Sequence, residues 1–458
     1  MLKIFNYHTP ESVRREGLGT SAKSTSHLQA AVLRSANKLF FTRIANKNNS
    51  ADVYQYTADI VHAVRKNGDR ALIAYTKKFD NVQLAPGTIR VTEKEFERAA
   101  RCVSRPVKQA VAAAIRNVRA FHRLQKTKNA LTFRGTLGEI LTLKSSPLES
   151  AGIYIPGGPG GTTPLISTLI MNTVPARIAG VPRIAAVSPP DKNGSLNFNL
   201  LYTMSTLGIT EAYKIGGPQA IAALAYGTHT VFPVDIITGP GNTWVSTAKK
   251  IVYGDVKIDG IFGPSEIVII ADDSADPRLL AADLLSQSEH AGSELSVLIT
   301  NDSELAKTVN TAISLQISGL SRKDIIKKSL TARGSILIVP DLNAACAAAD
   351  CIAPEHLELA VRRPEKLLRL IKNAGAVFAG HYAPEPIGDY ICGTNHVLPT
   401  DGSARFSAPL GVDMFIKKMN IIRYTPRAFH VYARHAAVLA EAEGLTAHRN
   451  SLAVRGGL

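Results

Sequence analysis

The chain has 458 residues, of which 45% are hydrophobic and 20% are charged. This length exceeds one ordinary core and suggests two to three domains, and the balance excludes an intrinsically disordered chain. The formal net charge is +16, but Lys and Arg are dispersed and no basic stripe carries interleaved aromatic residues. We interpret the charge as a solvated surface that helps to attract an anionic dinucleotide, and we expect no nucleic-acid site.

The apolar runs are strand-sized, so the sequence predicts no membrane span. The cysteines are scattered without CxxC spacing, which indicates a reducing, cytoplasmic compartment and excludes a thiolate metal site; they are Cys102, Cys346, Cys351 and Cys392. Residues 1–48 are interpreted as an N-terminal arm.

Helical spacing dominates residues 26–79, around a turn at 66–69. Short apolar strands then alternate with helices, which predicts parallel sheets built from βαβ units. Strands up to residue 250 suggest one sheet and those after 267 a second; the predicted strands are 153–156, 184–187, 212–215, 235–238, 267–271, 296–300 and 336–339. From about residue 410 the alternation ends, and the helical pattern at 429–445 is expected to pack on a partner.

Glycine clusters follow three of these strands, at 157–161, 216–217 and 239–241. Each opens a helix whose N–H groups could face a phosphate. None matches G-x-G-x-x-G; the nearest starts at Gly158 and has Thr163 in place of the third glycine. Each cluster is therefore either a tight turn or a cofactor contact.

The segment 278–290 has the pattern of a helix in which Leu280, Leu284 and Gln287 share an inward face, with His290 close by. An inward amide and imidazole need partners, either buried hydrogen bonds or a metal ion. Candidate partners far along the chain are Asp389, His396, Glu443 and His448. One amide, two imidazoles and a carboxylate would suit zinc, although spacing alone does not assemble them.

Glu355 and His356 are adjacent within APEHLEL at 353–359, so one backbone segment presents a carboxylate and an imidazole. Pro354 fixes its own φ and disfavours helix at Ala353. Two proton-handling groups on a stiff bend suit a reaction that removes more than one proton. The alternative is an ordinary helix start with Pro in the first turn.

Ten segments occur in an order that resembles histidinol dehydrogenase, a zinc enzyme family that oxidises L-histidinol twice with NAD to give L-histidine, the last step of histidine biosynthesis. The resemblance runs from about residue 50 to the C-terminus. The segments are GIYIPGG, GGPQAIAALAYGT, GPGN, GPSE, LLSQSEH, APEHLEL, GDY, GTNHVLPT, ARFSAPL and EAEGLTAH.

The resemblance implies one zinc ion per subunit, held by Gln287, His290, Asp389 and His448. It implies further substrate contacts from Ser265, His356, His396 and Glu443, and NAD contacts from Tyr154, Gln219 and Asn242. The loop at 157–163 differs from the loops typical of the family, which leaves the details of cofactor contact open.

The implied fold is α/β, with two related, incomplete Rossmann-like domains and small terminal dimerisation segments. We expect residues 49–152 with 267–409 to form the first domain, residues 153–266 the second, and residues 410–458 a tail. The tail would complete the active site of the partner in an intertwined homodimer.

In the mechanism that the resemblance implies, zinc orients the imidazole and amine of the substrate. His356 takes the hydroxyl proton during hydride transfer, and Glu355 then activates water to hydrate the bound aldehyde. Thiol catalysis by Cys351 or Cys392 is the rival second step.

Other functions remain open. A paralogue could oxidise a sulfonated alcohol, although Glu443 would repel a sulfonate. The protein could also be a zinc hydrolase in which Glu355 activates water, and such an enzyme would not need the residues expected to contact NAD.

Overall fold

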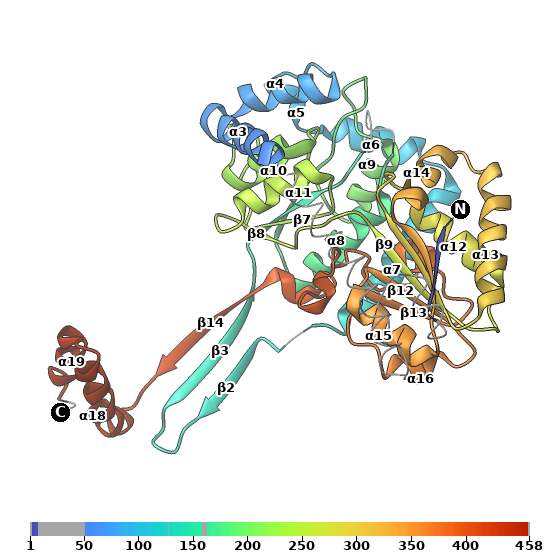
Figure 1. Cartoon of the computed structure of the whole chain (residues 1–458). Coiled ribbons are helices and arrows are strands. Elements are labelled where there is room, and N and C mark those ends of the chain that lie inside the picture. Colours follow the sequence, from blue (N-terminus) through green and yellow to red (C-terminus); the bar gives the residue numbers. More distant parts are fainter. Residues whose placement is uncertain (1, 8–50, 127, 158–162, 457–458) are drawn as a thin grey trace.

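The computed structural model describes residues 2–7, 51–126, 128–157 and 163–456. Two parallel β-sheets are each covered by helices, and a three-stranded antiparallel arm projects from them (Figure 1). The predicted α/β class with two parallel sheets is confirmed. None of the described helices is both long and apolar enough to cross a lipid bilayer. Most of the predicted N-terminal arm and the glycines at 158–161 lie outside the described residues.

The five-stranded sheet has the order β6-β5-β4-β7-β8, with every pair parallel. Its strands are β4 (Ser150–Tyr154), β5 (Arg183–Val187), β6 (Glu211–Tyr213), β7 (Ile236–Thr238) and β8 (Lys257–Ile258). One face packs on α6 (Glu93–Cys102), α7 (Arg105–Arg123), α8 (Ile166–Ala179) and α9 (Phe198–Thr206). The other face packs on α10 (Gly217–Tyr226) and α11 (Thr243–Val252).

The six-stranded sheet has the order β1-β11-β10-β9-β12-β13 and is also parallel throughout. Its strands are β1 (Lys3–Asn6), β9 (Glu266–Ala271), β10 (Leu295–Thr300), β11 (Gly334–Ile338), β12 (His356–Ala360) and β13 (Ala376–Ala379). One face is covered by α12 (Pro277–Ser288), α13 (Ser303–Gln316) and α14 (Lys323–Arg333), and the other by α15 (Leu342–Ile352) and α16 (Pro364–Leu368).

Burial on both faces explains why these strands have continuous apolar sequences. In β9, Ile267 and Ile269 face the α12 side, whereas Val268 and Ile270 face the α15 side. A strand buried on both faces needs apolar residues at every position. The seven predicted strands all exist. The sequence did not predict β1, β12 or β13, and β12 contains Glu358 among its buried positions.

The helices α3 (Ala51–Asn67) and α4 (Asp69–Asp80), followed by the short α5 (Pro86–Ile89), precede the sheets. We expected residues 49–152 to share a domain with 267–409. Instead Val61, Val64 and Leu72 share a hydrophobic core with α10, α11 and the five-stranded sheet. The inward apolar faces of α3 and α4 cover the face of α10 that would otherwise be exposed.

The arm consists of β2 (Ala130–Arg134), β3 (Ile140–Pro147) and β14 (Ile416–Arg423), in the order β14-β3-β2. It leads to α18 (Pro426–Ala442) and α19 (Thr446–Ala453), which lie far from both sheets (Figure 1). The helix predicted at 429–445 is therefore α18, which begins earlier because Thr425 Oγ1 caps it by accepting from Ala428 N. Short 3-10 turns occur at Ile317–Gly319, Ser403–Arg405 and Val412–Phe415.

The link between the sheets brings two unlike edges together. Strand β8 ends at Ile258 and β9 begins at Glu266, so only residues 259–265 separate them. The chain therefore passes from the carboxyl edge of the five-stranded sheet to the amino edge of the six-stranded sheet.

Candidate functional site

Glu355 and His356 lie where the chain enters β12. Helix α15 ends at Ile352, and Ala353 adopts a left-handed φ of 49° that turns the chain toward the strand. His356 then pairs with Ile267 of β9. The alternative of a helix start at Pro354 is wrong, because the left-handed turn ends α15 and strand pairing begins immediately after it.

The buried ring of His356 has a defined proton arrangement. Its Nδ1 lies 2.9 Å from Gln287 Oε1 and 3.1 Å from the carbonyl oxygen of Glu266, and both of these atoms are acceptors. Nδ1 therefore carries the proton, which leaves the Nε2 lone pair free. Nε2 is buried and has no hydrogen-bond partner among the described residues. Burial lowers the pKa of His356 to about 3, so the ring is neutral at physiological pH.

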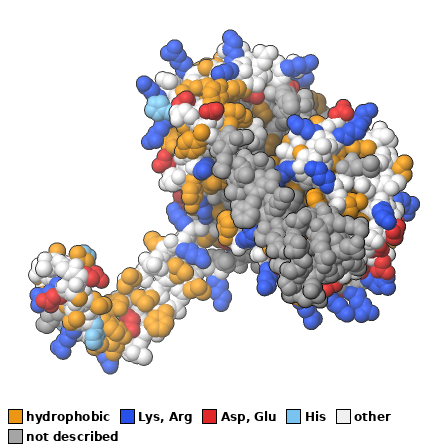
Figure 2. All heavy atoms as spheres, viewed as in Figure 1, with side chains coloured by type: hydrophobic (Ala, Val, Ile, Leu, Met, Phe, Trp, Pro, Cys, Tyr) orange, Lys and Arg blue, Asp and Glu red, His pale blue; other side chains and the backbone are white. Residues whose placement is uncertain are grey.

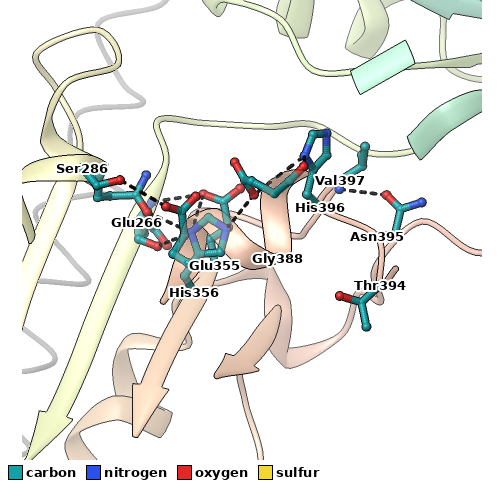
Figure 3. Close-up of polar contacts among 12 residues, drawn as sticks. Glu266, Ser286, Glu355, His356, Gly388, Thr394, Asn395, His396 and Val397 are labelled. Carbon is teal, nitrogen blue, oxygen red and sulfur yellow. Dashed lines mark hydrogen bonds and ion pairs between the residues drawn. The ribbon is translucent and has the colours of Figure 1, made fainter. Parts of the chain in front are cut away.

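Glu355 lies beside this ring. Its Oε2 accepts a hydrogen bond from Glu266 N at 3.0 Å and lies 3.8 Å from His356 Nδ1 (Figure 3). Burial, reinforced by the nearby charges of Glu266 and Asp389, raises the pKa of Glu355 well above its ordinary value. A neutral imidazole with a free Nε2 and a buried carboxyl group with a raised pKa thus stand side by side at the amino edge of the six-stranded sheet.

A second acidic group approaches from α17 (Glu385–Tyr390). Glu385 N donates to Glu358 Oε1 at 2.8 Å, which ties the start of α17 to β12. Asp389, one turn later, places Oδ1 3.9 Å from His356 Nε2. Burial raises the pKa of Glu385 to about 8 and that of Asp389 to about 6. The hydrogen bond between the two carboxyl groups raises the pKa of Glu385 further and lowers that of Asp389.

His356, Glu385 and Asp389 could together hold a metal ion, because one ligand atom from each lies within 4.8 Å of the others. Of these three, the sequence predicted only Asp389 as a metal ligand, and it missed Glu385 and Glu358 altogether. Two spacings could have indicated them. Glu358 follows His356 by two strand positions and so points to the same face, and Glu385 precedes Asp389 by one helical turn.

Gln287 and His290 are placed differently from each other. Gln287 is buried in the last turn of α12, as predicted, and its amide nitrogen has no partner within the described parts of the chain. His290 lies beyond the end of α12, which stops at Ser288, and it is exposed. Its imidazole is nevertheless close enough to lower the pKa values of His356 and His396.

His396 and Ser265 are two further predicted site residues near this cluster. His396 Nδ1 donates to the carbonyl oxygen of Asp389 at 2.9 Å, and burial lowers its pKa to about 4. Asn395 fixes this loop by donating to Met171 O at 2.7 Å. Ser265 immediately precedes β9, so it lies at the same sheet edge as Glu266.

Two expected contributors are absent from this cluster. Glu443 and His448 are exposed residues at the end of α18 and in α19, at the tip of the arm (Figure 1). The fold of a single chain therefore does not bring them to His356.

The predicted cofactor residues lie at the carboxyl edge of the five-stranded sheet. Tyr154 ends β4 and its hydroxyl accepts from Gly217 N at 3.2 Å, and burial raises its pKa to about 12. Gln219 lies in the first turn of α10, fully buried, and neither polar atom of its side chain meets a partner in the described structure. Asn242 caps α11 by accepting from Val245 N at 3.1 Å.

The rival thiols are poorly placed for catalysis. Burial raises the pKa of Cys351, which disfavours the thiolate. Cys392 Sγ lies 2.9 Å from Thr394 Oγ1, with which it shares a hydrogen bond.

Comparisons with known proteins agree with this geometry. A sequence model of the histidinol dehydrogenase family matches residues 44–456. The histidinol dehydrogenase of Oleidesulfovibrio alaskensis is 46% identical over 409 residues, covering 89% of this chain and 94% of that protein. The enzyme of Bacillus subtilis is 46% identical over 396 residues, covering 86% and 91%. The crystal structure of histidinol dehydrogenase from Elizabethkingia anophelis superposes with a TM-score of 0.84 at 34% identity, covering 99% of this chain and 98% of that one.

The two parallel sheets and these matches define an NAD-dependent oxidoreductase. Within that class, the chain belongs to the histidinol dehydrogenase family.

Proposed function

We propose that the protein oxidises L-histidinol to L-histidine through a bound aldehyde, with two successive hydride transfers to NAD, as the last step of histidine biosynthesis. The single observation that carries this proposal is the Glu355–His356 pair, with its unprotonated Nε2 beside a second proton-handling group. Four electrons leave the substrate, and each oxidation also releases a proton that a base must accept.

His356 is suited to take the proton of the substrate hydroxyl. Its Nδ1–H is fixed by Gln287 and Glu266, so Nε2 is the accepting atom. Because the ring remains neutral well below pH 7, the Nε2 lone pair is available throughout the physiological range. Once that proton has been released to solvent, the same Nε2 would take a proton from the aldehyde hydrate for the second hydride transfer.

Glu355 is suited to activate the water that forms this hydrate. Burial raises its pKa well above the ordinary value, which disfavours the carboxylate form that a base needs. A cation bound beside Asp389 would lower that pKa, because it favours the charged form of a nearby carboxylate. A bound metal should therefore increase the fraction of Glu355 that can act as a base.

Zinc is the metal that we propose, held by Gln287, His290 and Asp389 together with His448 of the partner subunit. The donor set of one amide, two imidazoles and one carboxylate fits zinc, and the Gln287 side-chain oxygen keeps a second lone pair for a metal besides the one that accepts from His356 Nδ1. When bound, zinc would supply a fixed anchor for the imidazole and amine of the substrate. His396, Ser265 and the partner's Glu443 would add contacts around the substrate.

We infer that NAD binds at the carboxyl edge of the five-stranded sheet, against Tyr154, Gln219 and Asn242. Ligands of parallel α/β sheets bind beyond the carboxyl ends of the strands, where helix N-termini attract phosphates. Gln219 is fully buried and its amide meets no partner among the described residues, which supports a ligand there. The short link at 259–265 would keep this edge close to His356.

We further infer a homodimer in which each arm reaches the site of the other subunit. Hydrophobic side chains cover much of the arm surface (Figure 2). The large hydrophobic residues exposed there in one chain include Leu131, Phe133, Met419, Ile422, Val438 and Leu439. An apolar surface of this kind marks an interface, and a second copy would bury it while delivering Glu443 and His448.

A cytoplasmic location is consistent with the four free thiols.

One assay tests the reaction directly. Purified protein loaded with zinc should convert L-histidinol to L-histidine and form two equivalents of NADH for each histidine. Histidine formation without NADH, or hydrolysis of esters in its place, would contradict the proposal. A sulfonated alcohol serves as the control substrate and should not be oxidised.

A further inference from the structure

Lys249 of α11 and Asp259, just after β8, form an ion pair in which each side chain is only 1% exposed. The pair is not part of the catalytic cluster. Burying two charges is costly, and an apolar pair of similar volume is often as stable. A buried pair of this kind therefore invites a reason beyond stability.

The ion pair binds both backbone groups of one residue, the N–H and the carbonyl of Gly239. Asp259 Oδ2 accepts from Gly239 N at 2.6 Å, and Lys249 Nζ donates to Gly239 O at 3.0 Å. Gly239 has a φ of +119°, and a Cβ added there would lie 2.0 Å from the carbonyl oxygen of Tyr154. Only glycine fits, and the ion pair fixes how it is oriented.

Gly239 begins the turn that ends at Asn242, the cap of α11. The backbone of this turn therefore passes directly against Tyr154, with Asn242 at its far end. The side chains of Tyr154 and Asn242 both belong to the cofactor site proposed above. The orientation of Gly239 therefore sets the shape of the backbone at the carboxyl edge of the five-stranded sheet.

The same pair also holds the link to the catalytic sheet. Asp259 Oδ1 accepts from Gly260 N at 2.8 Å, and Lys249 Nζ lies 4.7 Å from the ring centre of Phe262. Ser246 of α11 donates to Phe262 O at 2.8 Å. Four residues after Phe262, Glu266 donates its N–H to Glu355 and accepts from His356 through its carbonyl oxygen.

We propose that the Lys249–Asp259 ion pair is a positioning device that sets the Gly239–Asn242 turn, and with it the nicotinamide ring of NAD, relative to Glu355 and His356. Its two charges join the cofactor edge of one sheet to the catalytic edge of the other through one shared set of hydrogen bonds. This inference rests on the proposed cofactor site. A displacement of about 1 Å between reacting groups can reduce a rate by about a hundredfold, so a small shift of the turn should be visible in the kinetics.

The test uses the zinc-loaded full-length protein and three variants: Lys249→Met, Asp259→Asn and the double variant. Each single variant leaves a buried charge unpaired and should be destabilised, whereas the double variant removes both charges and should regain most of the stability. We expect kcat/KM for NAD to fall about tenfold to a hundredfold in all three variants, the double variant included. Zinc content and the affinity for L-histidinol should stay within twofold of the wild-type values.

The sole tryptophan, Trp244, gives a direct readout of cofactor binding. It lies in the first turn of α11, two residues after Asn242, so bound NADH should quench its emission by energy transfer. In the variants, the NADH concentration for half-maximal quenching should rise about tenfold or the extent of quenching should change.

Glu211→Gln is the matched control. It breaks the Arg183–Glu211 ion pair, which spans 2.8 Å at the amino edge of the same sheet, away from the cofactor edge. This variant should lose stability but keep its NAD kinetics within twofold.

Three results would overturn the inference: normal NAD kinetics in the single variants, recovery of these kinetics together with stability in the double variant, or failure of all three variants to fold. The wild-type protein reports on the proposed function separately. If it neither reduces NAD with L-histidinol nor transfers energy from Trp244 to NADH, the proposed function itself fails.

Discussion

Binding of zinc to the metal-free protein should release a proton that the buried acids hold until the metal arrives. Glu385 and Asp389 lie in one cluster with His356, and burial raises both carboxyl pKa values, to about 8 and about 6. A divalent cation in this cluster would favour the ionised forms, so metal binding and proton release are linked.

The size of the effect follows from these values. A group with a pKa of about 8 carries about 0.9 of a proton at pH 7 and about 0.1 at pH 9, whereas one with a pKa of about 6 carries only about 0.1 at pH 7. Glu385 should therefore account for about one released proton at pH 7 and about a tenth of that at pH 9.

Isothermal titration calorimetry can count these protons, by titrating zinc at one pH into two buffers that differ in ionisation enthalpy. Glu385→Gln is the matched variant, because it keeps the shape of the side chain and removes the titrating group. Wild type should release about one proton more than the variant at pH 7. Equal release by both proteins at pH 7, or a difference that grows toward pH 9, would refute this reasoning.

Four further predictions follow from the same site. The Glu355→Gln variant should lose aldehyde oxidation far more than alcohol oxidation in single-turnover assays, and equal losses would exclude the hydration role. Gln287→Ala and His448→Ala, each inactive alone, should recover about a quarter of wild-type activity when refolded together, because mixed dimers contain one intact site; recovery of nothing would exclude sharing. Glu385 has a folded pKa of about 8 and an unfolded pKa of about 4.5, so the folded protein binds more protons than the unfolded chain between these two pH values. The contribution of Glu385 to stability is therefore lost as pH rises. The melting temperature of the metal-free protein should therefore fall from about pH 5 to about pH 8, and Glu385→Gln should flatten that slope. Gly239→Ala should weaken NADH binding measured by fluorescence more than zinc binding, because its Cβ meets the Tyr154 carbonyl.

The helix patterns were the part of the fold that local sequence described well. Leu280, Leu284 and Gln287 share an inward face in α12 because helical spacing fixes which residues align, whatever lies opposite. The apolar strands were equally visible, because a strand buried on both faces has no polar alternation. By contrast, β12 alternates His356 and Glu358 with leucines, which is the pattern of a strand with one solvated face, although all five of its residues are buried.

The sequence therefore showed which residues could carry the chemistry, but it did not show how these residues are arranged in space. The adjacency of Glu355 and His356 keeps two proton-handling groups at one point of the chain, although it does not decide where each side chain points. Only the tertiary structure decided that Gln287 and Glu266 fix the proton on Nδ1, and that Glu385 and Asp389 come to lie beside His356. Those relations join residues that are tens of positions apart, and they exist because β9, β12, α12 and α17 meet at one sheet edge. Burial at that edge, which no local pattern records, is also what moves the pKa values on which the proposed chemistry depends.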